Sequence, residues 1–352
     1  MEFWNREREI EYLKRYIKSE PNAILFVYGP KSSGKSTLLM EVIDRLMVDE
    51  EFSSTHEVYW FDLRERLIAN YEDVVDVFFL DEEAAKLTIE KKRGTKFKIL
   101  SFFEVETEHK KLLEQRRIDP FKYMADVLRE SEKTGIIVFD EIQKLKDVYL
   151  NSPSNQRPLI KELFNFFVRL TKVLHLSHVI VMTSDTFFIE RVYTDSTLKN
   201  TSEYYLVDFF DDDTTHEILR SKGFSEEDSR HIVEWIGGVP WMMERVISRG
   251  INVVEELLEN AKASLRETLG SLYEEDPSLK EEAVDLLKRL LRGEDIDLEG
   301  KDRKITRILV EKEILYYDPI KGEIRFQTKL DERAAKELLE VIRWNSGTEK
   351  ER

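Results

Sequence analysis

The sequence predicts an α/β protein built on a parallel, doubly wound sheet. Three observations predict it: short continuous apolar runs recur through residues 1–208, segments with helical periodicity separate them, and a glycine-rich turn follows the first run. Continuous apolar runs are typical of strands buried on both faces, as the strands of a parallel sheet are. Strands that alternate with helices are the pattern of a sheet covered on both sides.

Each expected element follows from its own local pattern. Apolar side chains recur every three or four residues over 7–17, which predicts a helix that ends before Pro21. The apolar runs expected to form strands are 23–28, 58–61, 135–140, 179–183 and 204–207. Further helices are expected at 35–47, 121–130 and 159–170. Residues 64–118 mix a helical pattern with charged stretches, and we interpret them as an insertion at the edge of the core.

The pattern changes after residue 208. Short helices replace the strands, and near the C-terminal end two short runs, 314–317 and 323–327, flank a turn at 318–322. Two short runs around a Pro/Gly turn predict a β-hairpin, and helices followed by one hairpin describe a winged helix. The expected domains are a core at 1–208, a helical lid at 209–275 and a winged-helix domain at 276–352. A chain of 352 residues suits two or three domains.

Composition excludes several classes of protein. The chain has no cysteine, so it has neither a disulfide framework nor a thiolate metal site. Its net charge of −16 argues against nonspecific nucleic-acid binding by the whole surface. No apolar run is long enough to span a bilayer and no secretion signal is evident, so a soluble, cytoplasmic protein without a membrane partner is expected. Its richness in Lys and Glu is typical of thermophilic proteins.

The glycine-rich turn carries the strongest chemical signal. Residues 29–36 read Gly-Pro-Lys-Ser-Ser-Gly-Lys-Ser and match the P-loop (Walker A) pattern G-x-x-x-x-G-K-[ST] at every fixed position. Glycines let the backbone N–H groups turn toward phosphate oxygens, and the following helix presents its positive end. Lys35 is predicted to reach the β and γ phosphates, and Ser36 to join the shell of Mg²⁺. The predicted nucleotide contacts here are Gly29, Pro30, Lys31, Ser32, Ser33, Gly34, Lys35, Ser36 and Thr37. These residues predict a P-loop NTPase that binds ATP or ADP with Mg²⁺.

Two other strand ends are predicted to complete the site. The apolar run 136–139 leads into Asp140 and Glu141, the pattern of a Walker B strand. Asp140 is predicted to hold Mg²⁺ and Glu141 to act as the general base toward water. Thr183 and Ser184 lie at the end of the 179–183 strand, either as sensors of the γ phosphate or as an ordinary capped strand end.

Three short motifs carry a family resemblance. Residues 3–10 (Phe-Trp-Asn-Arg-Glu-Arg-Glu-Ile) are similar to an F-x-x-R-E-x-E-[LI] box, 140–143 to a D-E-x-Q Walker B, and 237–240 to a G-G-x-P signature. Together with the P-loop and the winged helix, they resemble the archaeal ATPase family of the STAND class, related to AAA+ and Cdc6/Orc proteins. The resemblance implies that Arg6 borders the nucleotide and that Pro240 approaches the base. An arginine finger is not identifiable; Arg191 could serve or could lie on the surface.

The leading functional hypothesis is a nucleotide-dependent molecular switch with slow ATP hydrolysis, whose lid and winged helix respond to nucleotide state. Its partner would be an unidentified protein or a second copy of the chain. The alternative is a DNA-binding or DNA-processing ATPase resembling Cdc6/Orc proteins. Its winged helix would then use Arg303, Lys304 and Arg307 on the expected helix 302–314.

Three further hypotheses are disfavoured. A small-molecule kinase fits poorly with a G-G-x-P element and a winged helix. A zinc site at His175 and His178 is disfavoured, because neither histidine has an adjacent acid or a cysteine at zinc-ligand spacing. Phe164, Phe166 and Phe167 lie at helical spacing, which favours core packing over a base-stacking surface. Adenine is preferred over guanine, because no [NT]-K-x-D element follows the 179–183 strand.

Overall fold

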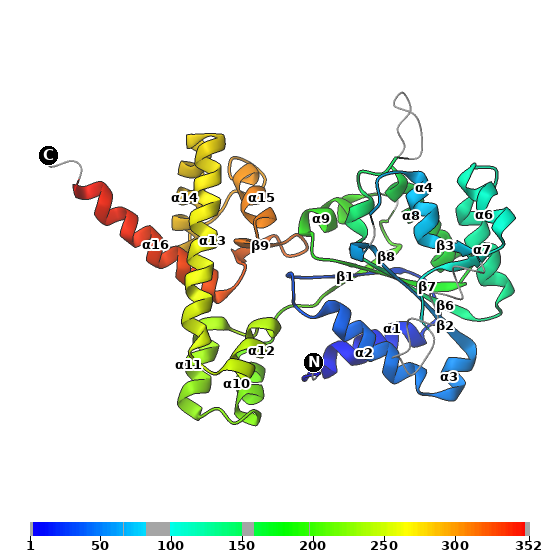
Figure 1. Ribbon diagram of the computed structural model, residues 1–352, viewed down its shortest axis with the longest axis horizontal. Helices are drawn as coiled ribbons and strands as arrows, with labels where there is room; N and C mark the ends of the chain where they lie inside the picture. The colour runs from blue at the N-terminus through cyan, green and yellow to red at the C-terminus, as the bar shows by residue number, and fades with distance from the viewer. Residues whose placement is uncertain (1–2, 66, 82–98, 150–157, 197, 349–352) are drawn as a thin grey trace. The chain divides into compact units, whose positions relative to one another are not determined.

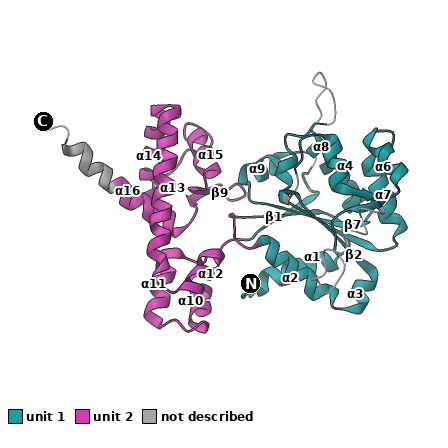
Figure 2. Ribbon diagram, in the orientation of Figure 1, with its two compact units in different colours: residues 1–29, 35–207 teal, residues 30–34, 208–352 magenta. Residues whose placement is uncertain are grey.

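The computed structural model describes residues 3–65, 67–81, 99–149, 158–196 and 198–348 (Figure 1). The chain divides into two compact units, shown in different colours in Figure 2. The first comprises residues 1–29 and 35–207, and the second comprises residues 30–34 and 208–352. The charged stretch 91–98, which formed part of the expected insertion, lies outside the described residues.

The first unit is built on a parallel sheet of six strands in the order β4-β2-β6-β7-β1-β8. The strands are β1 (Ile24–Tyr28), β2 (His56–Asp62), β4 (Ile99–Leu100), β6 (Thr134–Asp140), β7 (Ser177–Thr183) and β8 (Ser202–Leu206). This confirms the predicted parallel, doubly wound sheet. The chain crosses over so that β7 lies between β1 and β6, and it pairs in parallel with both. The carboxyl ends of three strands that are far apart in sequence therefore meet at one edge of the sheet.

Helices cover both faces of this sheet (Figure 1). On one face lie α1 (Glu7–Lys18), α2 (Lys35–Met47) and α3 (Glu50–Thr55). On the other lie α4 (Tyr71–Phe78), α6 (Thr107–Glu114), α7 (Pro120–Glu130), α8 (Leu159–Val168) and α9 (Thr186–Thr194). Short turns η1 (Leu63–Glu65) and η2 (Ile142–Leu145) follow β2 and β6, and the π-helical turn η3 (Arg169–Val173) follows α8.

Alternate residues of β1 pack on opposite faces, which explains why the whole strand is apolar. Leu25 and Val27 belong to the core formed with α1 and α2. Phe26 points the other way, and its ring meets that of Phe164 on α8 at 5.8 Å between centroids. Phe164, Phe166 and Phe167 are all buried, which confirms their predicted place in the core.

The region after β2 adds a small layer of its own. Strands β3 (Phe79–Asp81) and β5 (Phe103–Val105) pair in parallel as a separate two-stranded sheet. Tyr59 of β2 stacks on Phe103, with 4.5 Å between ring centroids, so this layer is fastened to the main sheet by aromatic packing. The very short strand β4 ends the sheet at the same edge.

The second unit is mainly helical. It contains α10 (Asp212–Ser221), α11 (Glu226–Ile236), α12 (Pro240–Arg249), α13 (Val253–Glu275), α14 (Pro277–Leu291), α15 (Arg303–Glu311) and α16 (Lys329–Thr348). Strands β9 (Leu315–Asp318) and β10 (Glu323–Phe326) form an antiparallel hairpin directly after α15. The helices and this hairpin agree with the predicted winged helix. Among the described residues, no helix combines the length and apolar character needed to cross a membrane.

One hydrophobic core holds the winged helix together. It gathers Leu286 and Leu287 of α14, Leu309 of α15 and Leu315 of β9. The second half of α13 enters the same core through Leu265, Leu269 and Leu272. This 23-residue helix also packs on α11 and α12. A single long helix therefore connects α11 and α12 with the winged helix.

Candidate nucleotide site

The loop between β1 and α2 has the backbone of a phosphate-binding turn. Gly29, Ser32 and Gly34 have positive φ angles of 149°, 61° and 91°. A Cβ atom on Gly29 would lie 2.2 Å from the carbonyl oxygen of Val207, so no side chain fits there. The consensus glycine is therefore required by the close approach of two backbone segments.

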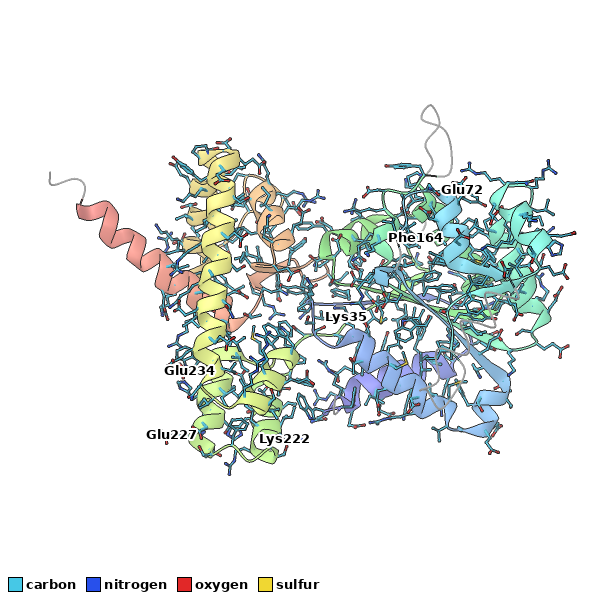
Figure 3. The ribbon with its side chains drawn as sticks, in the orientation of Figure 1. Lys35, Glu72, Phe164, Lys222, Glu227 and Glu234 are labelled. Atoms are coloured by element: carbon cyan, nitrogen blue, oxygen red, sulfur yellow. The ribbon has the colours of Figure 1, made fainter. Side chains whose placement is uncertain are left out.

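Lys35 begins α2 and lies buried beside this loop (Figure 3). Its Nζ donates a hydrogen bond to the carbonyl oxygen of Gly29 at 3.0 Å. Burial lowers the pKa of Lys35 to about 8, although the negative charges of Glu141 and Asp140 oppose the shift. Lys35 is predicted to reach the β and γ phosphates, and negative phosphate groups beside its amine would favour the charged form.

The structure brings Ser36 and Asp140 together from elements 104 residues apart. The Ser36 hydroxyl donates to Oδ2 of Asp140 at 2.7 Å. Asp140 is the last residue of β6 and is almost completely buried. Burial raises the pKa of this carboxyl, whereas the Ser36 hydrogen bond and the charge of Arg64 lower it. A carboxylate and a hydroxyl side by side are the hard oxygen ligands that Mg²⁺ prefers, so these residues fit the predicted metal.

Glu141 is held by a hydrogen-bonded chain that starts on β7. Its backbone is left-handed, with φ 63° and ψ 43°, and its N–H donates to the carbonyl oxygen of Met182 at 3.0 Å. Thr183 Oγ1 donates to Gln143 Oε1 at 2.8 Å, and Gln143 Nε2 donates to Glu141 Oε2 at 2.7 Å. Ser184 Oγ lies 3.5 Å from the other carboxylate oxygen of Glu141. The predicted base and both predicted sensor residues therefore form one cluster, with Gln143 at its centre.

Comparison with known proteins agrees with this geometry. A family model described as an ATPase domain predominantly from Archaea matches residues 3–246. This chain belongs to that archaeal ATPase family. A second model, described as the C-terminal domain of MJ1010-like ATP-binding proteins, matches residues 251–339. The predicted family is confirmed.

Two relatives match this chain over almost its whole length. The chain is 34% identical over 359 residues to the ATP-binding protein MJ1006 of Methanocaldococcus jannaschii, covering 97% of this chain and 95% of the relative. It is also 34% identical over 354 residues to the ATP-binding protein PYRAB09480 of Pyrococcus abyssi, covering 97% and 99%. The solved structure of the Walker-type ATPase PABY2304 of Pyrococcus abyssi aligns with a TM-score of 0.63 and 19% identity, over 95% of this chain and 96% of that one. This last likeness shows the shared fold.

One residue at the site of this archaeal ATPase was missed by the sequence analysis. Arg64, in the turn after β2, places a guanidinium nitrogen 2.6 Å from Oδ2 of Asp140. Strand β2 pairs with β6 so that Asp62 lies opposite Asp140, and this register brings Arg64 to the site. The sequence does show that a basic residue, Arg64, follows the 58–61 strand. It does not show that this strand lies beside the Walker B strand.

The other predicted residues fall in different places. Arg6 is buried, pairs with Glu9 at 3.0 Å, and adds a positive charge that helps to lower the pKa of Lys35. Thr37 is exposed on the first turn of α2. Pro240 begins α12 in the second unit. Arg191 donates to Phe187 of its own helix at 3.4 Å.

The G-G-x-P segment is shaped by its own unit. A Cβ atom on Gly238 would lie 2.0 Å from the carbonyl oxygen of Phe210, and Phe210 N–H donates to Gly238 at 3.0 Å. Gly237 has a positive φ of 59° and ends α11. These contacts explain both glycines, while the approach of Pro240 to the base stays a prediction.

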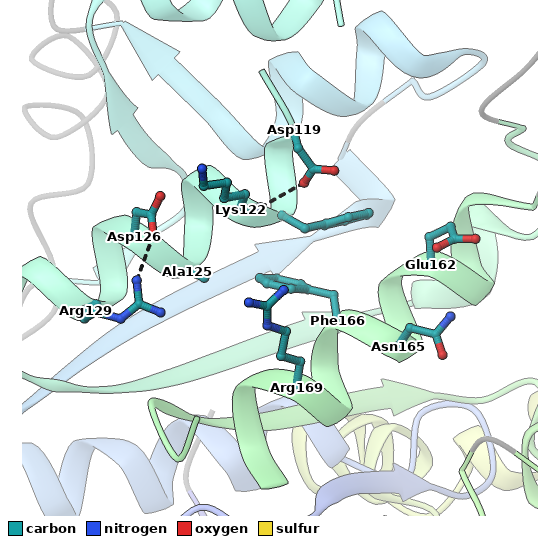
Figure 4. A pocket seen from close by; sticks show the side chains of 10 residues that line it. Asp119, Lys122, Ala125, Asp126, Arg129, Glu162, Asn165, Phe166 and Arg169 are labelled. Atoms are coloured by element: carbon teal, nitrogen blue, oxygen red, sulfur yellow. Dashed lines mark hydrogen bonds and ion pairs between the residues drawn. The ribbon is translucent and has the colours of Figure 1, made fainter. Parts of the chain in front are cut away.

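A separate pocket of about 580 Å³ lies between α7 and α8 (Figure 4). Phe121 and Phe166 stack at 5.0 Å between ring centroids, and both line the pocket together with Arg129 and Arg169. None of the predicted nucleotide contacts lines this pocket, so it does not belong to the site described above.

Proposed function

We propose that this protein binds Mg²⁺-ATP at residues 29–36, hydrolyses it slowly, and acts as a nucleotide-dependent molecular switch whose lid and winged helix respond to the nucleotide state. The observation that carries the proposal is the hydrogen bond from Ser36 to the buried carboxylate of Asp140 beside the glycine-rich loop. Membership of an ATPase-domain family and two relatives named as ATP-binding proteins support it.

In this proposal the residues of the chain divide the work of binding. Backbone N–H groups of the loop and the Lys35 ammonium hold the phosphates. Ser36 and Asp140 hold Mg²⁺, which when bound would offset the negative charge that develops on the transferred phosphate. Arg6 borders the nucleotide, and Pro240 approaches the base.

Glu141 is the base in this proposal. Its carboxylate accepts a proton from the attacking water, and Gln143 keeps it oriented through the 2.7 Å hydrogen bond. Thr183 and Ser184 connect the same cluster to the end of β7, where a change at the γ phosphate would be felt. Loss of this phosphate would therefore alter the hydrogen bonds of several residues at once.

Contacts inside the second unit support a shared response of lid and winged helix. Lys329 at the start of α16 pairs with Asp212 of α10 at 2.8 Å and also donates to the carbonyl oxygen of Val233. Arg325 of β10 pairs with Asp208 at 2.5 Å. With the long helix α13, the Lys329 contacts fasten the lid helices to the winged helix, and the Arg325 contact fastens the segment that leads into α10. We propose that the output is a changed contact with a protein partner or a second copy.

The test is nucleotide binding and turnover at elevated temperature by wild type, Lys35→Ala and Glu141→Gln. We expect Lys35→Ala to lose about 100-fold in ATP affinity, since a charged hydrogen-bond donor is removed. Glu141→Gln should bind ATP normally and lose about 1000-fold in turnover. Lys18→Ala and Glu130→Gln, exposed residues away from the site, serve as matched controls. ATP binding unaffected by Lys35→Ala would contradict the proposal.

The DNA-binding alternative rests on α15, where Arg303, Lys304 and Arg307 are exposed. Arg307 is already paired with Glu311 at 3.0 Å, and Arg303 donates to the carbonyl oxygen of Leu298, which weakens this candidate. Duplex affinity that falls steeply with salt and disappears in Arg303→Glu/Lys304→Glu would establish it. No affinity at low salt would remove it.

A further inference from the structure

The ion pair between Arg64 and Asp140 joins a half-exposed cation to a buried acid. The Arg64 side chain is 50% exposed, whereas that of Asp140 is 3% exposed. The guanidinium nitrogen that lies 2.6 Å from Asp140 Oδ2 also lies 3.4 Å from Ser36 Oγ. Arg64 therefore contacts the same two oxygens that fit Mg²⁺.

The backbone holds Arg64 in this place. Its N–H donates to Oδ1 of Asp62 at 2.9 Å, which closes a tight turn at the end of β2. Its carbonyl oxygen accepts a hydrogen bond from Lys144 at 3.2 Å. Two strand ends, β2 and β6, thus fix the point from which the side chain reaches Asp140. The pair follows from the register of the sheet and is not a chance meeting of surface side chains.

A metal and this guanidinium cannot share the carboxylate oxygen without cost. Mg²⁺ binds oxygen at about 2.0–2.1 Å and demands near-octahedral geometry. With both bound to Oδ2, two cations would lie within about 5 Å of each other in a partly buried site, where like charges repel strongly. One of them must leave.

We propose that Arg64 competes with Mg²⁺ for Asp140 and Ser36, so that the metal is held only after the guanidinium has released the carboxylate. This inference rests on the proposed function of the site. Arg64 neutralises the buried acid when no metal is held there, and the charge of an arriving triphosphate favours its release. Metal binding is thereby tied to nucleotide binding.

The experiment measures how strongly Mg²⁺ tightens nucleotide binding. The dissociation constant of a fluorescent N-methylanthraniloyl ATP is determined with MgCl₂ and with EDTA. The readout is the constant in EDTA divided by the constant in MgCl₂, which is larger when Mg²⁺ tightens binding more. We expect this ratio to rise about fivefold in Arg64→Ala, the size of effect expected from one Arg–carboxylate pair. Arg64→Lys should fall between wild type and Arg64→Ala, because lysine keeps the charge but loses the planar fork.

Arg129→Ala is the matched control. Arg129 is 51% exposed and pairs with Asp126 at 2.8 Å, but it lies on α7 away from the site, so its removal should leave the ratio unchanged. Thermal unfolding of each variant shows that it is folded. An unchanged ratio in Arg64→Ala would mean that the ion pair does not oppose metal binding and would overturn the inference. A reduced ratio would mean that Arg64 assists the metal-bound state, which also overturns it.

Asp140→Asn separates this result from the proposed function. Wild type should show a strong Mg²⁺ effect that Asp140→Asn largely loses. If both proteins respond equally to Mg²⁺, the metal assignment fails and the inference fails with it. If only Asp140→Asn loses the effect while Arg64→Ala equals wild type, the metal site stands and the competition alone is refuted.

Discussion

The strand ends of the first unit and the contact between α10 and α16 in the second unit use charged side chains in opposite ways. In the first, Lys35 and Asp140 are buried, and polar contacts converge on strand ends from distant parts of the sequence. In the second, Lys329 and Asp212 meet across helices while remaining 38% and 61% exposed. Burying a charge is costly unless partners compensate, whereas an exposed pair costs and contributes little.

This difference indicates which charged residues are candidates for binding or catalysis. A buried carboxylate such as Asp140 persists because Ser36 and Arg64 satisfy it, and a group kept at such cost is a candidate for function. The exposed pairs Asp208–Arg325 and Asp212–Lys329 join one element to another. Substitutions of the polar residues at these strand ends should therefore change ligand binding and turnover, and those at the exposed pairs should change the free energy of unfolding slightly.

The largest expected effect tests a feature that both units share. Gly29→Ala and Gly238→Ala should each lower the free energy of unfolding by about 3 kcal/mol, because the added methyl group would meet a backbone carbonyl oxygen at 2.2 and 2.0 Å. Urea unfolding measures both. Gly270→Ala is the control: it lies inside α13 with open space around it, and alanine should stabilise that helix by about 1 kcal/mol. Equal values for the three variants would contradict the close approach.

A buried histidine tests the cost of burial in the first unit. Burial lowers the pKa of His178 on β7 to about 4 from an ordinary 6.5. The unfolded chain then binds more protons than the folded one between pH 4 and 6.5. The free energy of unfolding therefore rises with pH through this window and reaches its full value above it. At pH 4, His178 should lower the free energy of unfolding by about 3 kcal/mol relative to its value above pH 6.5. Urea unfolding of His178→Leu should show a shallower loss in acid; a slope equal to that of wild type would refute this origin.

A smaller effect is expected from the hydrogen-bonded cluster at the strand ends. Gln143→Ala should lower ATP turnover about 30-fold and leave ATP affinity within about twofold, because Gln143 hydrogen-bonds the proposed base Glu141 and is not among the predicted nucleotide contacts. Thr183→Val should not add to this loss, since Thr183 acts through the same glutamine. Exposed Gln115→Ala is the control. Additive losses would show that the two residues act separately.

The smallest effect is expected at the surface of the second unit. Lys329→Ala should lower the free energy of unfolding by about 1 kcal/mol, because it removes an exposed pair to Asp212 and one hydrogen bond to Val233. A double-mutant cycle with Asp212→Ala isolates the pair, and exposed Lys321→Ala is the control. A coupling energy above about 3 kcal/mol would mean that the pair behaves like a buried one and would break the contrast with the strand ends of the first unit.

The parts of the fold that were predicted correctly depend on short stretches of chain. The apolar runs that became β1, β6 and β7 were visible because strands buried on both faces must be apolar throughout. The hairpin of β9 and β10 followed from a Pro/Gly turn between two short runs. The phosphate loop was visible because its glycines are required by local backbone geometry.

What the sequence by itself determined was therefore the α/β class, the P-loop segment, the acids at the end of β6 and the archaeal ATPase family. Only the tertiary structure decided that Arg64 pairs with Asp140, that Gln143 connects Thr183 to Glu141, and that α13 runs into the winged-helix core. The physical reason is range: backbone conformation and strand burial depend on neighbours a few residues away. The partners of a side chain at a strand end depend on strand order and register, which no short segment specifies.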